Sequence, residues 1–98
     1  MVYAIEEIKE KIIPIAQEYG VERVSLFGSY ARGEANENSD VDFYIEKGQI
    51  RNLIDYIGFV NDLEDNLNCH VDVITTGIED KSFLELIKKE GVLLYENG

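Results

Sequence analysis

The sequence contains the run Phe27-Gly28-Ser29-Tyr30-Ala31-Arg32-Gly33 and, after five intervening residues, Ser39-Asp40-Val41-Asp42. Glycine lets the backbone come close to a ligand, and a turn that opens a helix offers backbone N–H groups to a phosphate. Asp40 and Asp42 are two residues apart, so in a strand both side chains would project from one face. The run therefore predicts a phosphate-holding turn close to a pair of carboxylates.

Two neighbouring carboxylates repel each other, and a divalent cation between them removes that penalty. Hard oxygen ligands of this kind favour Mg²⁺ or Mn²⁺. Asp72 lies on a later expected strand, on the face opposite Val71 and Val73. If that strand is next to the strand of Asp40, a third carboxylate completes a site for two metal ions.

The spacing of apolar residues predicts helices and strands in the order α-β-α-β-α-β-α-β, which is typical of an α/β or α+β layered domain. The strand that ends at Gly28 is apolar on both faces near its end, so we expect it in the middle of a sheet. In residues 40–46, Val41, Phe43 and Ile45 should face the core. The expected elements are a helix at 5–19 closed by Gly20, a strand at 21–28, a short helix at 29–33, a strand at 40–46, a helix at 49–67, a strand at 69–75, a helix at 81–90 and a strand at 92–95.

The long helix expected at 49–67 has an apparent apolar stripe. Phe59 falls off that stripe, so together with Tyr56 it would be either an ordinary exposed aromatic or part of a protein-docking patch. The stripe consists of Ile50, Leu53, Ile54, Ile57, Val60 and Leu67.

Composition excludes several classes of protein. The 98 residues carry a net charge of −11, which is the wrong sign for a protein whose main partner is nucleic acid. A basic protein or a metal-bridged ligand is the more suitable partner. The chain has no apolar run long enough to cross a membrane, no signal peptide and one cysteine, Cys69, so we expect one domain over residues 1–98 in the reducing cytoplasm.

The run from Phe27 to Asp42 resembles the signature of the DNA polymerase beta-type nucleotidyltransferase superfamily. It is most similar to the minimal nucleotidyltransferases (MNT proteins), many of which are MntA-like antitoxins paired with a HEPN-domain ribonuclease toxin. The resemblance covers essentially the whole chain, including the closing run Gly91 to Tyr95. It implies a small nucleotidyltransferase domain that uses Mg²⁺, with two ions expected and Mn²⁺ as an alternative. The implied reaction transfers AMP from ATP to a tyrosine hydroxyl of the toxin, in a hetero-oligomeric complex.

The resemblance also implies a role for individual residues. Asp40 and Asp42 would hold the metal ions, and Asp72 would help to hold the catalytic ion and take the proton from the attacking hydroxyl. Gly28 and Ser29 would hold the triphosphate.

Two further residues are candidates for binding the nucleotide, each with a structural alternative. Arg32 would either clamp a phosphate or pair with Glu34 on the surface. Ser39 would either orient Asp40 or simply end the loop.

The remaining polar and aromatic candidates have simpler interpretations. We expect His70 at an edge of the sheet or at the surface, with contact to the nucleotide as its alternative, and Cys69 as a small buried residue. Tyr30 and Tyr44 would either stack on a base or pack in the core.

Two other functions remain open from the sequence. The same fold could neutralise a toxin by occlusion without catalysis, or it could modify a small molecule. The acidic charge and the short length both favour a protein acceptor over RNA.

Overall fold

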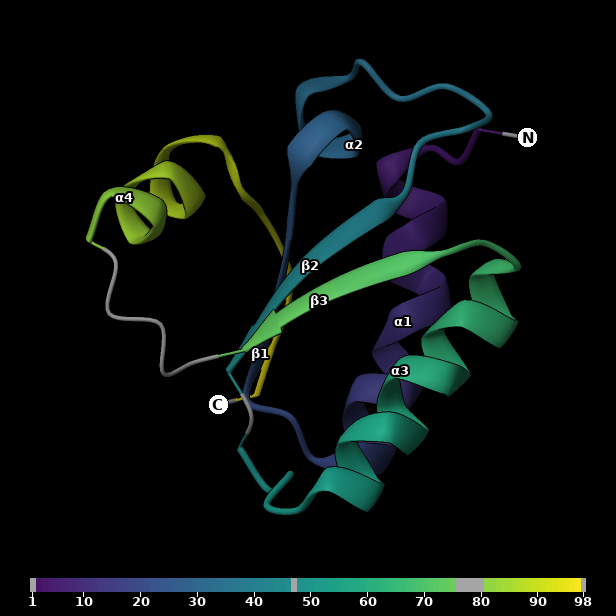
Figure 1. Cartoon of the computed structure of the whole chain (residues 1–98), viewed down its shortest axis with the longest axis vertical. Coiled ribbons are helices and arrows are strands. Elements are labelled where there is room, and N and C mark those ends of the chain that lie inside the picture. Colours follow the sequence, from purple (N-terminus) through teal and green to yellow (C-terminus); the bar gives the residue numbers. More distant parts are fainter. Residues whose placement is uncertain (1, 47, 76–80, 98) are drawn as a thin grey trace.

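Four strands form a mixed sheet in the order β3-β2-β1-β4 (Figure 1). β1 (Arg23–Phe27) is central and pairs antiparallel with both β2 (Val41–Glu46) and β4 (Val92–Glu96), which confirms the expected central position. β3 (Val71–Thr75) is parallel to β2 and lies at an edge of the sheet. The computed structural model describes residues 2–46, 48–75 and 81–97.

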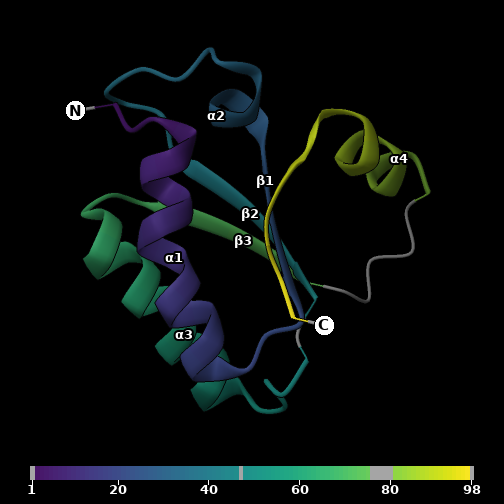
Figure 2. The same cartoon turned by 180° about the vertical axis from the view of Figure 1, so that it is seen from behind.

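Helices lie on both sides of this sheet. α1 (Ile5–Tyr19) and α3 (Leu53–Leu67) lie side by side against one face, and α4 (Lys81–Glu90) lies beyond the opposite face (Figures 1 and 2). The short helix α2 (Gly28–Arg32) follows β1 directly. The observed order of elements is the one expected from the sequence. Among the described residues, no helix is both long and apolar enough to cross a membrane.

The core lies between the sheet and the α1–α3 pair. Val41, Phe43 and Ile45 are fully buried, so β2 has its apolar side chains on the core face as predicted. The buried side chains of α1 recur at helical spacing, and Pro14 is exposed on the other side of that helix. Gly20 ends α1 in the left-handed conformation, which confirms the expected cap. The residues that α1 buries are Ile8, Ile12, Ile15 and Ala16.

The predicted buried face of the long helix is wrong in its first half, but it is correct at Leu67, which is fully buried, and at Val60, which packs half-buried against the core. Leu53, Ile54 and Ile57 are 71%, 81% and 49% exposed, whereas Phe59 is completely buried. The helix begins at Leu53 rather than at Gln49 because Asn52 caps it, its side chain accepting a hydrogen bond from the Asp55 N–H at 2.8 Å. Ile50 is buried but precedes the helix, so its spacing to later residues says nothing about the helical face. The residues that α3 buries fully are Phe59, Leu63 and Leu67.

Tyr19 and Phe59 join the two helices. Their rings pack edge to face with centroids 5.5 Å apart, and the Tyr19 hydroxyl donates a hydrogen bond to Asp62 Oδ2 at 2.8 Å. That hydrogen bond, with burial and the Asp62 charge, raises the pKa of Tyr19 to about 12. These contacts fix the rotation of α3 and leave its Leu53–Ile54–Ile57 side facing outward.

Candidate functional site

The parallel pairing of β2 with β3 brings the acidic residues together. Asp42 and Asp72 are partners in register on the two strands. Asp40 comes directly before β2, and His70 comes directly before β3. The strand that carries Asp72 is therefore next to the strand that carries Asp42, which is the condition that the sequence set for a three-carboxylate site.

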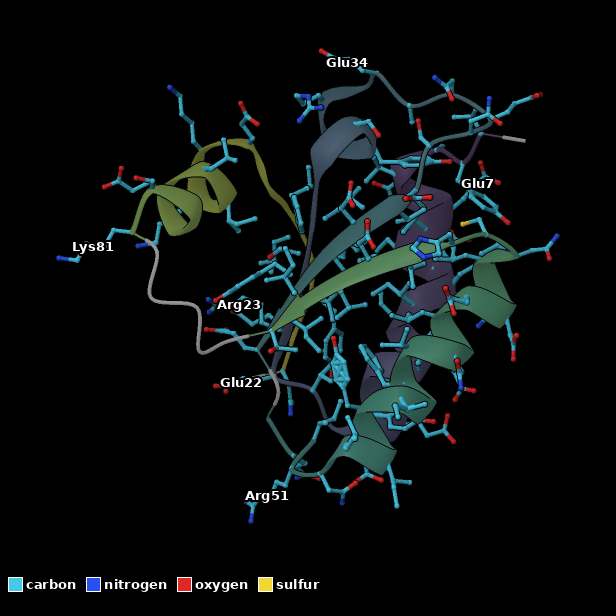
Figure 3. All side chains as sticks on the ribbon, viewed as in Figure 1. Glu7, Glu22, Arg23, Glu34, Arg51 and Lys81 are labelled. Atoms are coloured by element: carbon cyan, nitrogen blue, oxygen red, sulfur yellow. The ribbon has the colours of Figure 1, made fainter. Side chains whose placement is uncertain are left out.

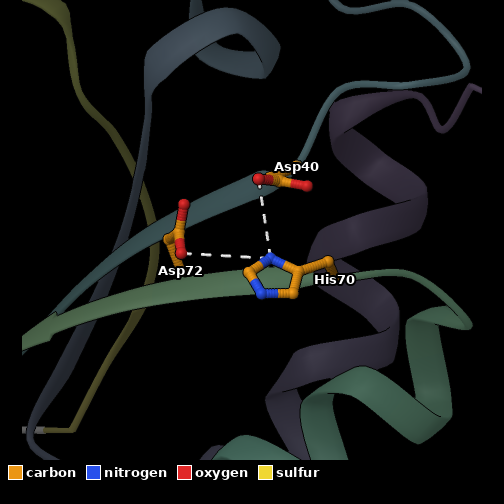
Figure 4. Close-up of side chains that lie close together, drawn as sticks. All are labelled: Asp40, His70 and Asp72. Carbon is orange, nitrogen blue, oxygen red and sulfur yellow. Dashed lines mark ion pairs between the residues drawn. The ribbon is translucent and has the colours of Figure 1, made fainter.

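A compact set of metal-ligand side chains lies at this end of the two strands (Figure 4). His70 Nδ1 is 3.5 Å from Asp40 Oδ2 and 3.9 Å from Asp72 Oδ1. One ligand atom from each of these three residues lies within 4.8 Å of the other two, and all three residues are exposed. This spacing leaves the donor atoms in reach of one ion and accessible from solvent.

His70 was not expected to be part of the site. The sequence did place His70 and Asp72 on the same face of their strand, because they are two residues apart. That alternation is the sequence signal for this placement. His70 is exposed, as expected, and it also lies within the cluster of ligand atoms.

The pKa of the Asp42 carboxyl is raised from 3.8 to about 6. Partial burial is the largest cause, the charges of Asp72 and Asp40 and a hydrogen bond with Asp72 act in the same direction, and Arg32 acts in the opposite direction. A divalent cation among these oxygen and nitrogen donors would offset the repulsion between the carboxylates, which contributes to this shift. The donor set therefore fits a divalent metal ion.

Gly28 touches Asp42, and this contact explains why the position is a glycine. Its φ is +75°, and a Cβ built on it would lie only 2.2 Å from Asp42 Oδ2. A side chain at this position would thus meet both backbone strain and the carboxylate itself. The turn and the carboxylate pair, which the sequence associated only through their spacing, are in direct contact.

The turn continues into α2, of which Ser29 is the second residue. Ser29 is half-buried, and Gly33 ends the helix in the left-handed conformation. The first N–H groups of a helix have no acceptor within the helix. The backbone at Gly28 and Ser29 can therefore offer donors to a phosphate beside Asp42.

Arg32 and Ser39 both make the structural contacts that were their alternatives. Arg32 Nε is 3.3 Å from Glu34 Oε2, and its guanidinium is 3.9 Å from Glu90. Ser39 Oγ accepts a hydrogen bond from the Asn36 N–H at 2.9 Å and so closes the loop before β2. Arg32 still acts on Asp42 through its charge.

The aromatic and thiol candidates are buried or half-buried. Tyr30 is buried in the core, so core packing is its role. Tyr44 is half-buried. Cys69 is half-buried rather than fully buried, and burial raises the pKa of its thiol. Tyr56 is also half-buried, and its hydroxyl donates a hydrogen bond to the Val73 carbonyl at 3.1 Å.

Three comparisons with known proteins all point to nucleotidyltransferases. The family model described as "Polymerase beta, Nucleotidyltransferase" matches residues 10–98. A provisionally named protein adenylyltransferase of Methanocaldococcus jannaschii is 49% identical over 71 residues, which cover 72% of this chain and 76% of the relative. A solved structure, provisionally named a minimal nucleotidyltransferase, superposes with a TM-score of 0.77 at 30% identity over 90% of each chain.

A likeness of fold extends to a toxin–antitoxin complex. A chain in the structure of the tri-AMPylated HEPN toxin of Shewanella oneidensis with its MNT antitoxin superposes with a TM-score of 0.69 at 18% identity. The alignment covers 94% of this chain and 72% of that one. The residues matched by the family model include Gly28, the three aspartates and His70.

Proposed function

Because the chain belongs to the polymerase beta nucleotidyltransferase family, we propose that this nucleotidyltransferase moves AMP from ATP to a tyrosine hydroxyl of a HEPN ribonuclease toxin. The relative named as a protein adenylyltransferase and the AMPylated toxin in the related complex both support this reaction. The observation that carries the proposal is the in-register pair of Asp42 and Asp72, of which Asp42 lies against Gly28. It joins a metal-binding pair to a phosphate-binding turn.

Asp40, Asp42 and Asp72 are the residues that would hold Mg²⁺ or Mn²⁺, and His70 Nδ1 is an additional donor within reach. When bound, divalent ions neutralise charge on the triphosphate and make the attacking hydroxyl more acidic. The residues of the chain position these groups. Asp42 lies against Gly28 and beside Asp72 on the neighbouring strand, so its carboxylate is placed between the turn and the second carboxylate.

In the proposed transfer of AMP, each of these residues has a separate role. The backbone at Gly28 and Ser29 binds the triphosphate, and Arg32 adds a positive charge nearby. The hydroxyl oxygen attacks the α-phosphorus, the bond from that phosphorus to the bridging oxygen breaks, and pyrophosphate leaves. Asp72 takes the hydroxyl proton, since its carboxylate is exposed and adjoins Asp42.

The charge of the chain favours a protein acceptor over RNA. A protein with a net charge of −11 repels RNA and attracts a basic surface. Acting as one nucleotidyltransferase domain in the cytoplasm, the chain would be an antitoxin that silences its toxin by covalent modification.

An antitoxin that acts only by occlusion is the second candidate, favoured by the exposed apolar side of α3. Toxin protection in growing cells separates the two functions. We expect Asp40→Ala/Asp42→Ala to lose protection while still binding the toxin. Glu6→Ala/Glu10→Ala, which removes two exposed carboxylates from α1 and changes the net charge equally, should protect as the wild type does. Full protection by the Asp40/Asp42 variant would establish occlusion instead.

A further inference from the structure

Three large aliphatic side chains project from the outer side of α3. Leu53, Ile54 and Ile57 are 71%, 81% and 49% exposed. They lie within two turns of one helix, so they form a continuous apolar surface, which we call the α3 face. Single exposed aliphatic residues are common, but a cluster of this kind on a highly charged protein marks an interaction site.

The α3 face is continuous with the catalytic residues. A groove of about 310 Å³ runs between α3 and β3, and both Ile57 and Val60 line it. His70 and Asp72 line the same groove. A molecule that covers Ile57 therefore reaches the carboxylate that would take the acceptor proton.

Strand pairing at the edge of β3 is not the mode of binding that this groove offers. The Tyr56 hydroxyl already donates to the Val73 carbonyl at 3.1 Å, and Glu64 Oε2 accepts from the Val71 N–H at 3.4 Å. Since side chains of α3 occupy these backbone groups, a partner would pack its own side chains against the α3 face.

The charges around the groove select the partner. Glu64 and Asp72 line the groove, and Asp55 is exposed on α3 between the aliphatic residues. Arg51 is a basic residue at the N-terminal end of α3, where it points away from the molecule (Figure 3). A second copy of this chain would bring another charge of −11 to an acidic surface, which disfavours self-association.

We propose that the α3 face and this groove form the docking site for the acceptor protein, which inserts an apolar segment flanked by basic residues. The inference rests on the proposed function, because it assigns the surface by which the acceptor hydroxyl reaches Asp72. Docking at the α3 face places that segment along α3 and its reactive hydroxyl at the end of the groove.

Glutamate substitutions on the α3 face test the proposal. Ile54→Glu and Ile57→Glu introduce a residue with good helix propensity at exposed positions, so both variants should keep the fold. Leu93→Glu is the matched control, because Leu93 is 51% exposed on β4, at the opposite edge of the sheet. The dissociation constant with a candidate HEPN-domain toxin is measured by calorimetry for each full-length variant. Circular dichroism, ATP binding and the kcat and KM of AMP transfer are measured alongside.

We expect the two α3 variants to bind the HEPN protein about tenfold or more weakly, with a raised KM for that protein and unchanged ATP binding. Leu93→Glu should behave as the wild type, and added salt should weaken wild-type binding. The docking proposal is overturned if the α3 variants bind and react as the wild type does, or if Leu93→Glu has an equal effect.

Failure of the proposed function gives a different result. If the wild type binds the HEPN protein tightly through the α3 face but transfers no AMP, the enzymatic function fails and the docking site stands. If the wild type transfers AMP and the α3 variants do so with unchanged KM, the function stands and the docking site fails. If the wild type neither binds nor modifies this protein, both fail.

Discussion

Gly28 shows how one residue combines two requirements. The sequence explains the glycine by the approach of a phosphate, and the structure adds the approach of Asp42, whose carboxylate occupies the space where a side chain would be. Gly33, at the other end of α2, has nearly the same φ of +74°, but no atom of the described residues lies within 4 Å of the place that its Cβ would take. The two glycines therefore separate backbone strain from the contact with Asp42.

We expect Gly28→Ala and Gly33→Ala to lose similar stability from backbone strain, on the order of 1 kcal/mol each. Only Gly28→Ala should also displace the Asp42 carboxylate and weaken Mg²⁺ binding and nucleotidyl transfer. Chemical denaturation measures the first effect, and calorimetric titration with Mg²⁺ measures the second. Equal Mg²⁺ affinity in the two variants would show that the contact does not position Asp42.

Asp42 should make the stability of the metal-free protein depend on pH. Its pKa is about 6 in the folded protein against the ordinary 3.8, so ionisation of this carboxyl disfavours folding. Its contribution is fully present below about pH 4 and is lost as the pH rises through about 6. Asp42→Asn removes this ionisation.

We therefore expect Asp42→Asn to be more stable than the wild type at pH 7, by about 1 kcal/mol because solvent screens part of the repulsion, and to lose this advantage near pH 4. Thermal unfolding in the presence of a chelator measures the difference. Mg²⁺ should stabilise the wild type and have less effect on the variant. Parallel pH profiles for the two proteins would contradict this explanation.

At the scale of the element, α3 is where sequence and structure differ most. Apolar residues occur at helical spacing on two sides of α3, and the sequence alone does not show which side is buried. Burial of Phe59 against Tyr19 selects the face that carries Leu63 and Leu67, of which Leu67 also belongs to the predicted stripe. Ile50 appeared to extend the predicted stripe by one turn, but it lies before the Asn52 cap and outside the helix.

Alanine substitutions on the two sides of α3 should show which side is buried in the core. Leu63 is 1% exposed, so Leu63→Ala should cost roughly 2–5 kcal/mol through lost burial and a cavity. Ile54 is 81% exposed, so Ile54→Ala should change stability by less than about 0.5 kcal/mol. Urea unfolding midpoints measure both, and the reverse ranking would mean that α3 is rotated from the position described.

At the scale of the whole molecule, the order of helices and strands and the side-chain alternation of β2 follow from the sequence, because both depend on local periodicity. The pairing of Asp42 with Asp72 depends on which strands are neighbours, a long-range property that local periodicity does not determine. Residues 40–42 and 72 could be selected from the sequence, whereas the position of His70 between Asp40 and Asp72 required the strand register. The exposed side of α3 likewise required the packing of the complete core.

The most direct test of the central proposal is intact-mass spectrometry of the HEPN protein after incubation with this protein, ATP and Mg²⁺. We expect a mass gain of one or more AMP units, absent when Asp40→Ala/Asp42→Ala replaces the wild type and retained with Glu6→Ala/Glu10→Ala. An unmodified HEPN protein that nevertheless binds the wild type and the Asp40/Asp42 variant equally tightly would contradict enzymatic transfer and leave binding as the function.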